Sequence, residues 1–354
     1  MAKISELDKN LNVSHALDPA VKECFDFYDV EEAPFALYGV FREGENFVRL
    51  PRSVAEATSE GVEALNNHTA GGRIRFVTDS PRIALLAKVQ NGGGMPHFAY
   101  AGVSGFDLYA DFEGYKRYFG TFMPPLGFDG GYESVVNLPS SESREVNINM
   151  PLYNKVYKVY VGIEKGYSLS AAEPLLNPPV VYYGSSITQG GCACRPGNCY
   201  QAIIHKDLKT NYINLGFSGN AKGEDAIMEY IASLDMSVFV YDYDHNAPSV
   251  EHLHNTHFKG YKKVREAHPE MPIIMMTRPK YHIDSNELKR NAEVRASYEK
   301  GIAEGDKNLY FIDGRELLDP EMIEWSLVDN CHPTDVGFFG MAKRIAVLLK
   351  KFVD

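Results

Sequence analysis

The sequence lacks any run of about 18 consecutive apolar residues, the length that a membrane-spanning helix requires, so we expect no membrane span. Its first twenty residues lack an apolar stretch behind a basic start, and we therefore expect no secretory signal and a cytoplasmic protein. Basic residues are also outnumbered. The 36 Lys and Arg against 47 Asp and Glu give a formal charge of -11, which is the wrong sign for holding nucleic acid.

Cysteine is scarce, with five residues in an odd number and at irregular spacing. This pattern argues against a disulfide framework, so we expect reduced thiols. Cys192, Cys194 and Cys199 form a C-x-C-x4-C cluster that could bind a metal, but structural zinc sites usually have paired C-x2-C spacings. We predict no metal here and interpret these residues as small buried thiols that pack a glycine-rich loop.

The length of 354 residues exceeds the size at which one hydrophobic core usually stops growing, which predicts two domains. A hydrophobic content of 44% with 23% charged residues is ordinary for a globular protein and excludes extended disorder. The pattern of the sequence changes at the proline-bearing stretch 171–179, from closely spaced short apolar runs to apolar runs that alternate with helical patterns. We therefore predict an N-terminal domain over residues 1–172 and a C-terminal domain over residues 173–354.

Short apolar runs separated by Gly, Pro, Asn and Ser fill residues 25–165, and several of them alternate polar with apolar residues. Such alternation is typical of half-buried strands, and helical periodicity is almost absent. The N-terminal domain is therefore predicted to be an antiparallel β-sandwich or jelly roll. Its many aromatic residues, including Tyr109, Tyr115 and Tyr118, fit sugar stacking but fit an ordinary β core better.

The C-terminal half alternates apolar runs with helical patterns, which predicts an α/β domain with a parallel sheet covered on both faces. A closing helix is expected over residues 335–353, with Thr334 as its N-cap. In an open parallel sheet, sites form beyond the carboxyl ends of the strands, so functional residues should directly follow strands. The five predicted strands are VVYY, YINL, SVFVY, IIMM and LYFID.

The segment YGSSITQG, residues 183–190, follows the first of these strands, and its glycines would let the backbone of Ser186 approach a substrate. A serine hydroxyl is a poor nucleophile until a base takes its proton, so a Gly-Ser turn alone means little. Asp329 and His332 lie three apart before the last helix. They could supply a base and the carboxylate that orients it, although a solvated loop would explain this pair equally well.

Two further turns could stabilise a developing oxyanion. Gly219, in NLGFSGN after the second strand, could lend a backbone N–H, although a turn glycine with positive φ is the better interpretation of this residue by itself. Asn246 follows the third strand and could lend its side-chain NH2, or could be an ordinary Asx-turn residue.

The ordered set of Ser186, Gly219, Asn246 and the Asp329-x-x-His332 pair resembles the motif blocks of the SGNH, or GDSL-like, hydrolases. The resemblance covers residues 177–354 and implies a flavodoxin-like α/β/α domain with a five-stranded parallel sheet. It also implies that Ser186 is the nucleophile, that Asp329 and His332 complete a triad, and that the oxyanion hole consists of the Ser186 N–H, the Gly219 N–H and Asn246. No cofactor is implied.

Two departures from the family pattern stand out. The family usually has Gly-Asp-Ser where this chain has Gly184-Ser185-Ser186, and that Asp is not a triad member. The family usually has Gly-x-Asn-Asp where this chain keeps only Asn246, in the segment Asp244–Ala247.

The surroundings suggest a substrate class. The loops near the predicted site are small, polar and charged, which suits a short acyl group on a hydroxyl-rich carrier. Trp325 could offer a flat face to a sugar ring or be a core residue, and Arg278 in the loop TRPKYHID is a further candidate for substrate binding. His245 could touch substrate. It belongs to a histidine cluster that we interpret as solvated positions and not as metal ligands: His245, His252, His254 and His257.

The segments GSSITQGG, C-x-x-R-P-G and NLGFSGN, behind a β-sandwich, are similar to the two-domain bacterial β-mannan acetylesterases. This resemblance implies a serine esterase that removes O-acetyl groups from oligosaccharide hydroxyls, with acetylated oligosaccharide as partner. Two alternatives stay open: a lysophospholipase or thioesterase, and a non-catalytic carbohydrate-binding protein. A homodimer is conceivable, because symmetric dimers are the commonest assemblies.

Overall fold

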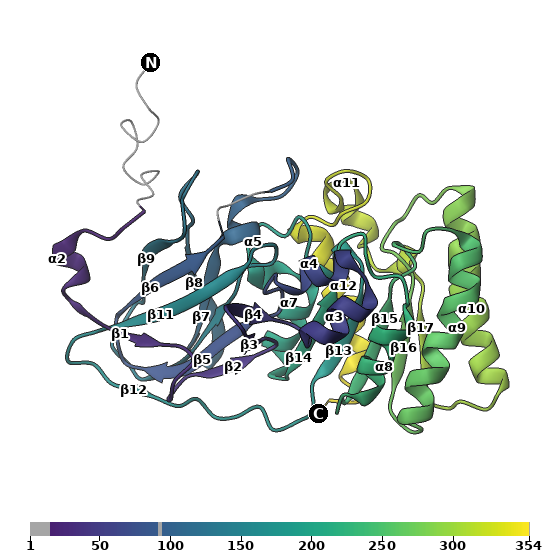
Figure 1. Ribbon diagram of the computed structural model, residues 1–354, viewed down its shortest axis with the longest axis horizontal. Coiled ribbons are helices and arrows are strands. Elements are labelled where there is room, and N and C mark those ends of the chain that lie inside the picture. The colour runs from purple at the N-terminus through teal and green to yellow at the C-terminus, as the bar shows by residue number, and fades with distance from the viewer. Residues whose placement is uncertain (1–14, 91–93, 354) are drawn as a thin grey trace, which may run out of the picture.

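A computed structural model describes residues 15–90 and 94–353 of the chain. Its N-terminal half contains two antiparallel sheets that pack face to face (Figure 1). The first sheet runs in the order β1 (Phe25–Asp29), β11 (Val156–Glu164), β6 (Arg82–Val89) and β9 (Tyr132–Asn137). The second runs β12 (Leu169–Ser170), β5 (Arg73–Thr78), β10 (Arg144–Asn149), β7 (Phe106–Phe112) and β8 (Tyr115–Phe122), with β2 (Ala36–Tyr38) paired to β5.

The core of this sandwich consists of alternate residues from both sheets, as the pleat of a strand requires. Ile83 and Leu85 of β6 belong to the same buried cluster as Phe106 and Leu108 of β7. The predicted antiparallel β-sandwich is therefore confirmed, and the jelly-roll connection of its strands stays a prediction.

The C-terminal half contains a parallel sheet whose five strands are the five predicted apolar runs. The strand order places the first strand between the second and the third, so the strand order reverses beside β13. Ligands in open sheets bind at such a reversal, beyond the carboxyl ends of the strands. The order is β14 (Tyr212–Gly216), β13 (Val180–Gly184), β15 (Val238–Asp242), β16 (Ile273–Met276) and β17 (Leu309–Ile312).

Helices cover both faces of this sheet, which confirms the predicted α/β architecture (Figure 1). The predicted closing helix begins after Thr334, whose hydroxyl accepts a hydrogen bond from the Gly337 N–H. One face carries α7 (Tyr200–Leu208) and α12 (Asp335–Leu349), and the other carries α8 (Asp225–Ser233), α9 (Val250–Ala267) and α10 (Ser285–Ala303).

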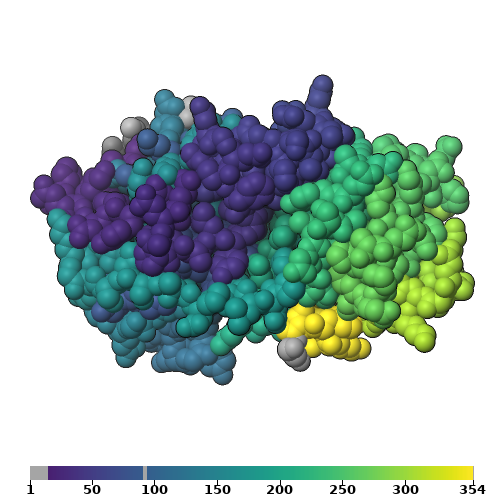
Figure 2. Space-filling model, turned by 60° about the horizontal axis from the view of Figure 1, so that its bottom comes forward, coloured from purple at the N-terminus to yellow at the C-terminus, as the bar shows by residue number. Residues whose placement is uncertain are grey.

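The N-terminal half also contains helices, although its sequence shows almost no helical periodicity. α3 (Arg52–Thr58) and α4 (Glu60–Asn66) lie within it, and their buried side chains pack in the same core as β13. Figure 2 shows the early, purple part of the chain lying directly against the green C-terminal part. The predicted boundary between residues 172 and 173 thus separates the two kinds of sheet, while apolar packing runs across it. Shorter elements are α2 (Pro19–Lys22), β3 (Phe41–Glu43), β4 (Asn46–Val48) and α5 (Tyr100–Ser104).

Candidate active site

Ser186 is the first residue of α6 (Ser186–Gln189), a single helical turn that follows β13 directly. The side chain of Ser185 caps this turn by accepting the Ile187 N–H. The sharp strand-to-helix turn depends on Gly184, because a Cβ there would lie 2.1 Å from Thr188 Oγ1. The chain is thus forced to present Ser186 at the carboxyl end of the central strand.

The Ser186 hydroxyl lies within hydrogen-bond distance of His332, with Oγ 2.8 Å from Nε2. The other ring nitrogen, Nδ1, lies 2.8 Å from Asp329 Oδ2. A proton on Nδ1 that is donated to the carboxylate leaves Nε2 as an acceptor for the Ser186 hydroxyl, so this hydrogen-bond network assigns the tautomer of His332. The structure therefore joins these three residues in one chain of hydrogen bonds.

Asp329 is itself held in place by the tight turn that it starts. Its Oδ1 accepts the backbone N–H groups of His332 at 2.7 Å and of Cys331 at 3.1 Å. Although burial opposes it, these hydrogen bonds and that from the His332 ring hold the pKa of the Asp329 carboxyl below its usual value. The carboxylate is therefore ionised and fixed in orientation beside the imidazole.

Gly219 lies on the exposed turn after β14, with φ +70° and no atom within 4 Å of the place a Cβ would take. Within the described part of the chain, no acceptor pairs with its N–H or with that of Ser186. The Asn246 side chain reaches the same turn, because its Nδ2 donates to the Phe217 carbonyl at 2.9 Å. This bond uses one of the two amide hydrogens and leaves the other for a ligand.

Arg49, from the N-terminal half, fixes the strand end that leads into this turn. Its guanidinium donates to the carbonyls of Asn214 at 3.1 Å and Gly216 at 2.6 Å, and it stacks on the Phe217 ring at 4.4 Å. Burial lowers the pKa of Arg49 to about 9. A buried arginine of the N-terminal half thus positions the loop that carries Gly219.

Two rings from the loop between β6 and α5 lie beside the triad, and sequence reasoning missed both. His97 Nε2 lies 3.8 Å from Asp329 Oδ2, and the centroids of the His97 and His332 rings are 5.3 Å apart. Phe98 packs edge-on to the His332 ring at 6.0 Å. The signal available in the sequence was a histidine in a glycine-rich segment, and nothing local to that segment connects it to residue 332.

Further contacts anchor α6 to the N-terminal half. Tyr153 donates its hydroxyl proton to the Ser186 carbonyl at 3.1 Å. Gln189 donates to the Leu152 carbonyl at 3.2 Å and accepts the Ser218 N–H at 3.0 Å, so it links α6 to the turn of the predicted oxyanion hole. Contacts with the N-terminal half therefore hold in place the helical turn that carries Ser186.

The glycine-rich loop after α6 is held by a partly buried ion pair between the two halves. Asp107 of β7 is fully buried, and its Oδ2 accepts from Arg195 at 2.7 Å and from the Gly197 N–H at 2.8 Å. The Tyr109 hydroxyl accepts from Arg195 at 2.6 Å. Tyr109 thus contacts Arg195 at the seam between the N-terminal and C-terminal halves.

The three predicted substrate-binding residues occupy different environments. Trp325, on α11 (Ile323–Ser326), is 61% exposed, so the alternative of a core tryptophan was wrong. His245 lies beside the triad turn, with Nε2 3.2 Å from Cys331 Sγ, and its buried Nδ1 has no partner among the described residues. Arg278 donates to Glu287 at 3.0 Å, so its charge is already paired.

The C-x-C-x4-C cysteines do not converge. Cys192 and Cys199 are buried as predicted, but Cys194 is exposed, and its Sγ lies 2.6 Å from Asp335. The histidine cluster is likewise dispersed. His254 pairs with Glu293 at 2.9 Å, whereas His257 is buried against Tyr241, which corrects its assignment as solvated.

A different set of side chains could hold a metal ion, because the ligand atoms of His97, Cys192 and His332 all lie within 4.8 Å of one another. Asp329, Cys331 and His332 form a second such group. Both groups contain His332, so a metal there would compete with its hydrogen bond to Ser186. Burial raises the pKa of the Cys192 thiol to about 12, which opposes metal binding because a thiol must be deprotonated to ligate.

Comparison with known families identifies the class. Residues 177–350 match the GDSL-like lipase/acylhydrolase family, and residues 25–169 match the N-terminus of SGNH-hydrolase-type esterases, named GxDLY. The chain therefore belongs to the GDSL-like, or SGNH, hydrolases. The letters of GxDLY appear here as Gly105-Phe106-Asp107-Leu108-Tyr109, so the motif contains the two residues that contact Arg195. No curated protein matches the chain significantly.

Solved structures share the two-part architecture. A GDSL-like lipase from Bacteroides ovatus is 28% identical, with a TM-score of 0.84 over 92% of this chain and 97% of that one. A salicylyl-acyltransferase from a tetracycline biosynthetic pathway is 19% identical, with a TM-score of 0.76 over 94% and 99%. An acetyl xylan esterase from Butyrivibrio proteoclasticus is 11% identical, with a TM-score of 0.59 over 92% and 98%, a likeness of fold alone.

No helix among the described residues has both the length and the apolar composition needed to cross a bilayer.

Proposed function

We propose that this protein is a serine esterase that removes O-acetyl groups from the hydroxyls of oligosaccharides. The observation that carries the proposal is the chain of two 2.8 Å contacts from the Ser186 hydroxyl through His332 to Asp329. Such a chain makes a serine hydroxyl nucleophilic, because the imidazole accepts its proton and the carboxylate stabilises the imidazolium.

In the proposed mechanism, Ser186 Oγ bonds to the acetyl carbonyl carbon while its proton passes to His332 Nε2. The carbonyl oxygen becomes an oxyanion, which the N–H groups of Ser186 and Gly219 and the side chain of Asn246 would hold. The bond to the sugar oxygen then breaks, and His332 returns its proton to that oxygen. Water attacks the acetyl-enzyme, gives a proton to His332, and releases acetate and the Ser186 hydroxyl.

The surroundings favour a small acyl group on a sugar. Phe98 and the Tyr153 ring pack edge-on at 4.6 Å, and both lie against the triad, so aromatic side chains line the site on the side of the sandwich. Trp325 offers an exposed aromatic face on the helix that precedes the triad turn. The similarity of the motifs to β-mannan acetylesterases makes acetylated manno-oligosaccharides the substrate to test first.

The direct experiment follows acetate release from defined acetylated manno-oligosaccharides by NMR. The wild-type protein should release acetate, and Ser186→Ala should lower kcat by about three to six orders of magnitude with an unchanged fold. Ser143→Ala is the matched control, since it removes an exposed hydroxyl on the loop before β10 and leaves the triad and the turn that carries Ser186 complete. Near-normal turnover by Ser186→Ala would exclude the proposed nucleophile.

The other enzyme class, a lysophospholipase or thioesterase, is distinguished by chain length. Activity that rises from acetyl to octanoyl esters would favour it over the acetylesterase. A carbohydrate-binding protein without activity would hydrolyse neither series and still bind the oligosaccharide. A cytoplasmic location and a homodimer stay predictions.

A further inference from the structure

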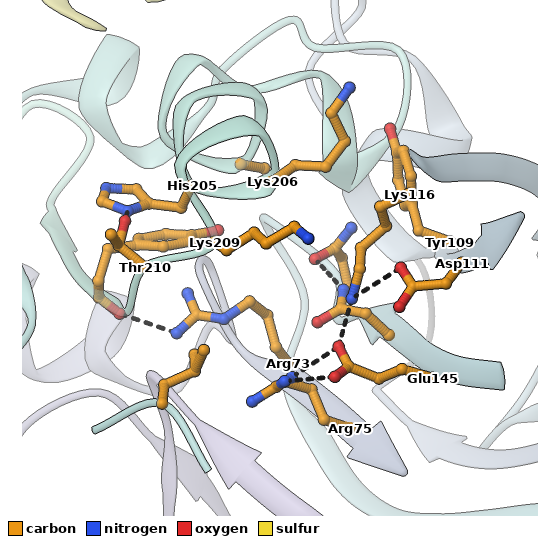
Figure 3. A pocket seen from close by; sticks show the side chains of 15 residues that line it. Arg73, Arg75, Tyr109, Asp111, Lys116, Glu145, His205, Lys206, Lys209 and Thr210 are labelled. Atoms are coloured by element: carbon orange, nitrogen blue, oxygen red, sulfur yellow. Dashed lines mark hydrogen bonds and ion pairs between the residues drawn. The ribbon is translucent and has the colours of Figure 1, made fainter. Parts of the chain in front are cut away.

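A second cavity lies at the seam between the two halves, away from the triad (Figure 3). Its volume is about 140 Å³. One wall is the outer face of the second sandwich sheet, where every second residue of β5 and β10 points away from the sandwich core. The opposite wall consists of α7, its C-terminal end and the beginning of β14, so the cavity lies at the end of β14 opposite to Gly219.

The charge of this cavity is opposite to that of the whole protein. Its lining contains five cationic side chains and two acidic ones, in a chain whose formal charge is -11. A basic concave site in an acidic protein focuses the potential on anions. The cationic residues are Arg73, Arg75, Lys116, Lys206 and Lys209.

The two carboxylates do not neutralise all of this charge, although Lys206 also pairs at 3.0 Å with Asp207, which lies outside the lining. Glu145 accepts from Arg75 at 2.7 Å and also pairs with Lys116, which lies 3.8 Å from Asp111. Figure 3 shows dashed lines that join Glu145 to Arg75 and to Lys116, whereas none joins Lys209 or Arg73 to a carboxylate. Within residues 15–90 and 94–353, neither Lys209 nor Arg73 has a carboxylate within ion-pair distance.

Arg73 is only 5% exposed, yet its guanidinium meets neutral acceptors alone. It donates to Asn211 Oδ1 at 2.6 Å and to the Tyr212 carbonyl at 3.1 Å, and it stacks on the Tyr212 ring at 3.8 Å. Burial lowers its pKa. Arg75 is also buried, and its Nη1 has no hydrogen-bond partner in the part of the chain that the structure describes. A buried cation without an anion, such as Arg73, is costly, so an anionic ligand would stabilise this site.

The remaining residues of the cavity lining suit a ligand ring that carries hydroxyl groups. Asn147, Asn149, Tyr109 and Thr210 add amide and hydroxyl groups, and Tyr212 adds an aromatic face. A cavity near 150 Å³ accommodates about one six-membered ring. We propose that this seam cavity binds a single sugar ring that carries a carboxylate or a phosphate, with Arg73 and Lys209 on the charged group.

The cavity has an entrance. A groove of about 670 Å³ shares Lys116, Lys206 and Lys209 with it and continues along the β7–β8 hairpin. Tyr115 and Tyr118 of β8 are exposed in this groove, where they can stack against further sugar rings of a longer ligand.

Calorimetric titration and thermal shift of the whole protein test the proposal with four probes: glucuronate, glucose 6-phosphate, glucose and inorganic phosphate. We expect one anionic sugar to bind and to raise Tm, and glucose to do neither. Lys209→Gln should weaken this binding about tenfold, as the loss of one charged hydrogen bond implies. Lys307→Gln is the matched control, because it removes an exposed lysine elsewhere and should leave binding unchanged.

Binding of glucuronate alone would identify an acidic glycan as the source of the ligand, and binding of glucose 6-phosphate alone would identify a sugar phosphate. If inorganic phosphate binds as tightly as either sugar, the proposal that the cavity recognises a sugar ring is wrong. If none of the four probes binds, the proposed binding site is wrong altogether. Ser186→Ala should bind the ligand normally, so this result is independent of the esterase proposal.

Discussion

The parallel sheet presents Ser186, Gly219 and Asn246 on turns directly after its strands, whereas the sandwich reaches the same site through loops and buried polar side chains. The first group would act on the substrate. The second group, which includes Arg49 and Asp107, holds the turns that carry the first. The sandwich is therefore part of the framework of the candidate active site and not a module merely tethered to it.

The largest expected effect lies on the parallel-sheet side, at the triad carboxylate. Asp329→Asn keeps the shape of the side chain but removes the charge that fixes the His332 tautomer, so kcat should fall about 10⁴-fold. Steady-state hydrolysis of a chromogenic acetate ester measures this. Asp335→Asn, a nearby carboxylate outside the triad, should retain most of the activity, and equal losses in both variants would argue against a special role for Asp329.

Asn246→Ala should have the next largest effect, because it removes the side-chain donor of the proposed oxyanion hole. We expect a loss of about 2.7–4 kcal/mol of transition-state stabilisation, seen in kcat more than in KM. Asn220→Ala is the control, since Asn220 lies on the same turn and donates to the Ser218 carbonyl. An unchanged kcat in Asn246→Ala would assign the third donor to another residue.

On the sandwich side, Arg195→Met leaves the buried Asp107 carboxylate without its cation. The free energy of unfolding should fall by about 3 kcal/mol, because removing Arg195 leaves the buried Asp107 carboxylate without a counter-charge. Denaturant unfolding measures this. The double variant Asp107→Asn/Arg195→Met should recover part of the loss, and strictly additive effects would show that the pair is not coupled.

Trp325→Ala separates substrate binding from chemistry. If the exposed ring stacks on a sugar, KM for an acetylated oligosaccharide should rise about fivefold, roughly 1 kcal/mol, while a small chromogenic ester is hydrolysed as before. A parallel loss on both substrates would indicate that Trp325 supports the triad turn instead.

The smallest expected effect is on the pH dependence of stability, and it comes from Asp242, the buried last residue of β15. Burial raises the pKa of Asp242 well above its usual value, so the folded protein keeps this proton to higher pH than the unfolded chain does. The stability that this group contributes is present at acidic pH and is lost as pH rises through the folded pKa. Asp242→Asn cannot titrate and can still accept the hydrogen bond from Thr188.

The variant should therefore gain stability relative to the wild type as pH rises from the unfolded-state pKa of Asp242 towards its higher folded-state pKa. Urea unfolding of both proteins from about pH 5 to about pH 8 tests this sign. If the difference in unfolding free energy between the two proteins stays constant across this range, the pKa of the Asp242 carboxyl is not raised in the folded protein.

Much of the parallel-sheet side could be predicted from the sequence, because its signals are local. Buried apolar runs such as VVYY predicted β13, and Thr334 marked the start of α12. The position of each polar residue directly after a strand then predicted which side chains would meet. The family resemblance added the order of the blocks.

The sandwich contribution could not be predicted in the same way. His97 and Arg49 reach the site through contacts between residues far apart in the chain, and their local sequence does not encode these contacts. The short helices α3 and α4 were missed because seven residues hold barely two turns of periodicity, and their burial comes from packing on the parallel sheet.

Active-site labelling tests the central claim most directly, because only an activated serine reacts with a fluorophosphonate. Intact mass and peptide mapping of the treated wild-type protein should show one adduct, on Ser186, while His332→Ala reacts far more slowly and Ser186→Ala not at all. Absence of an adduct on the folded wild-type protein, or an adduct on another residue, would contradict the account.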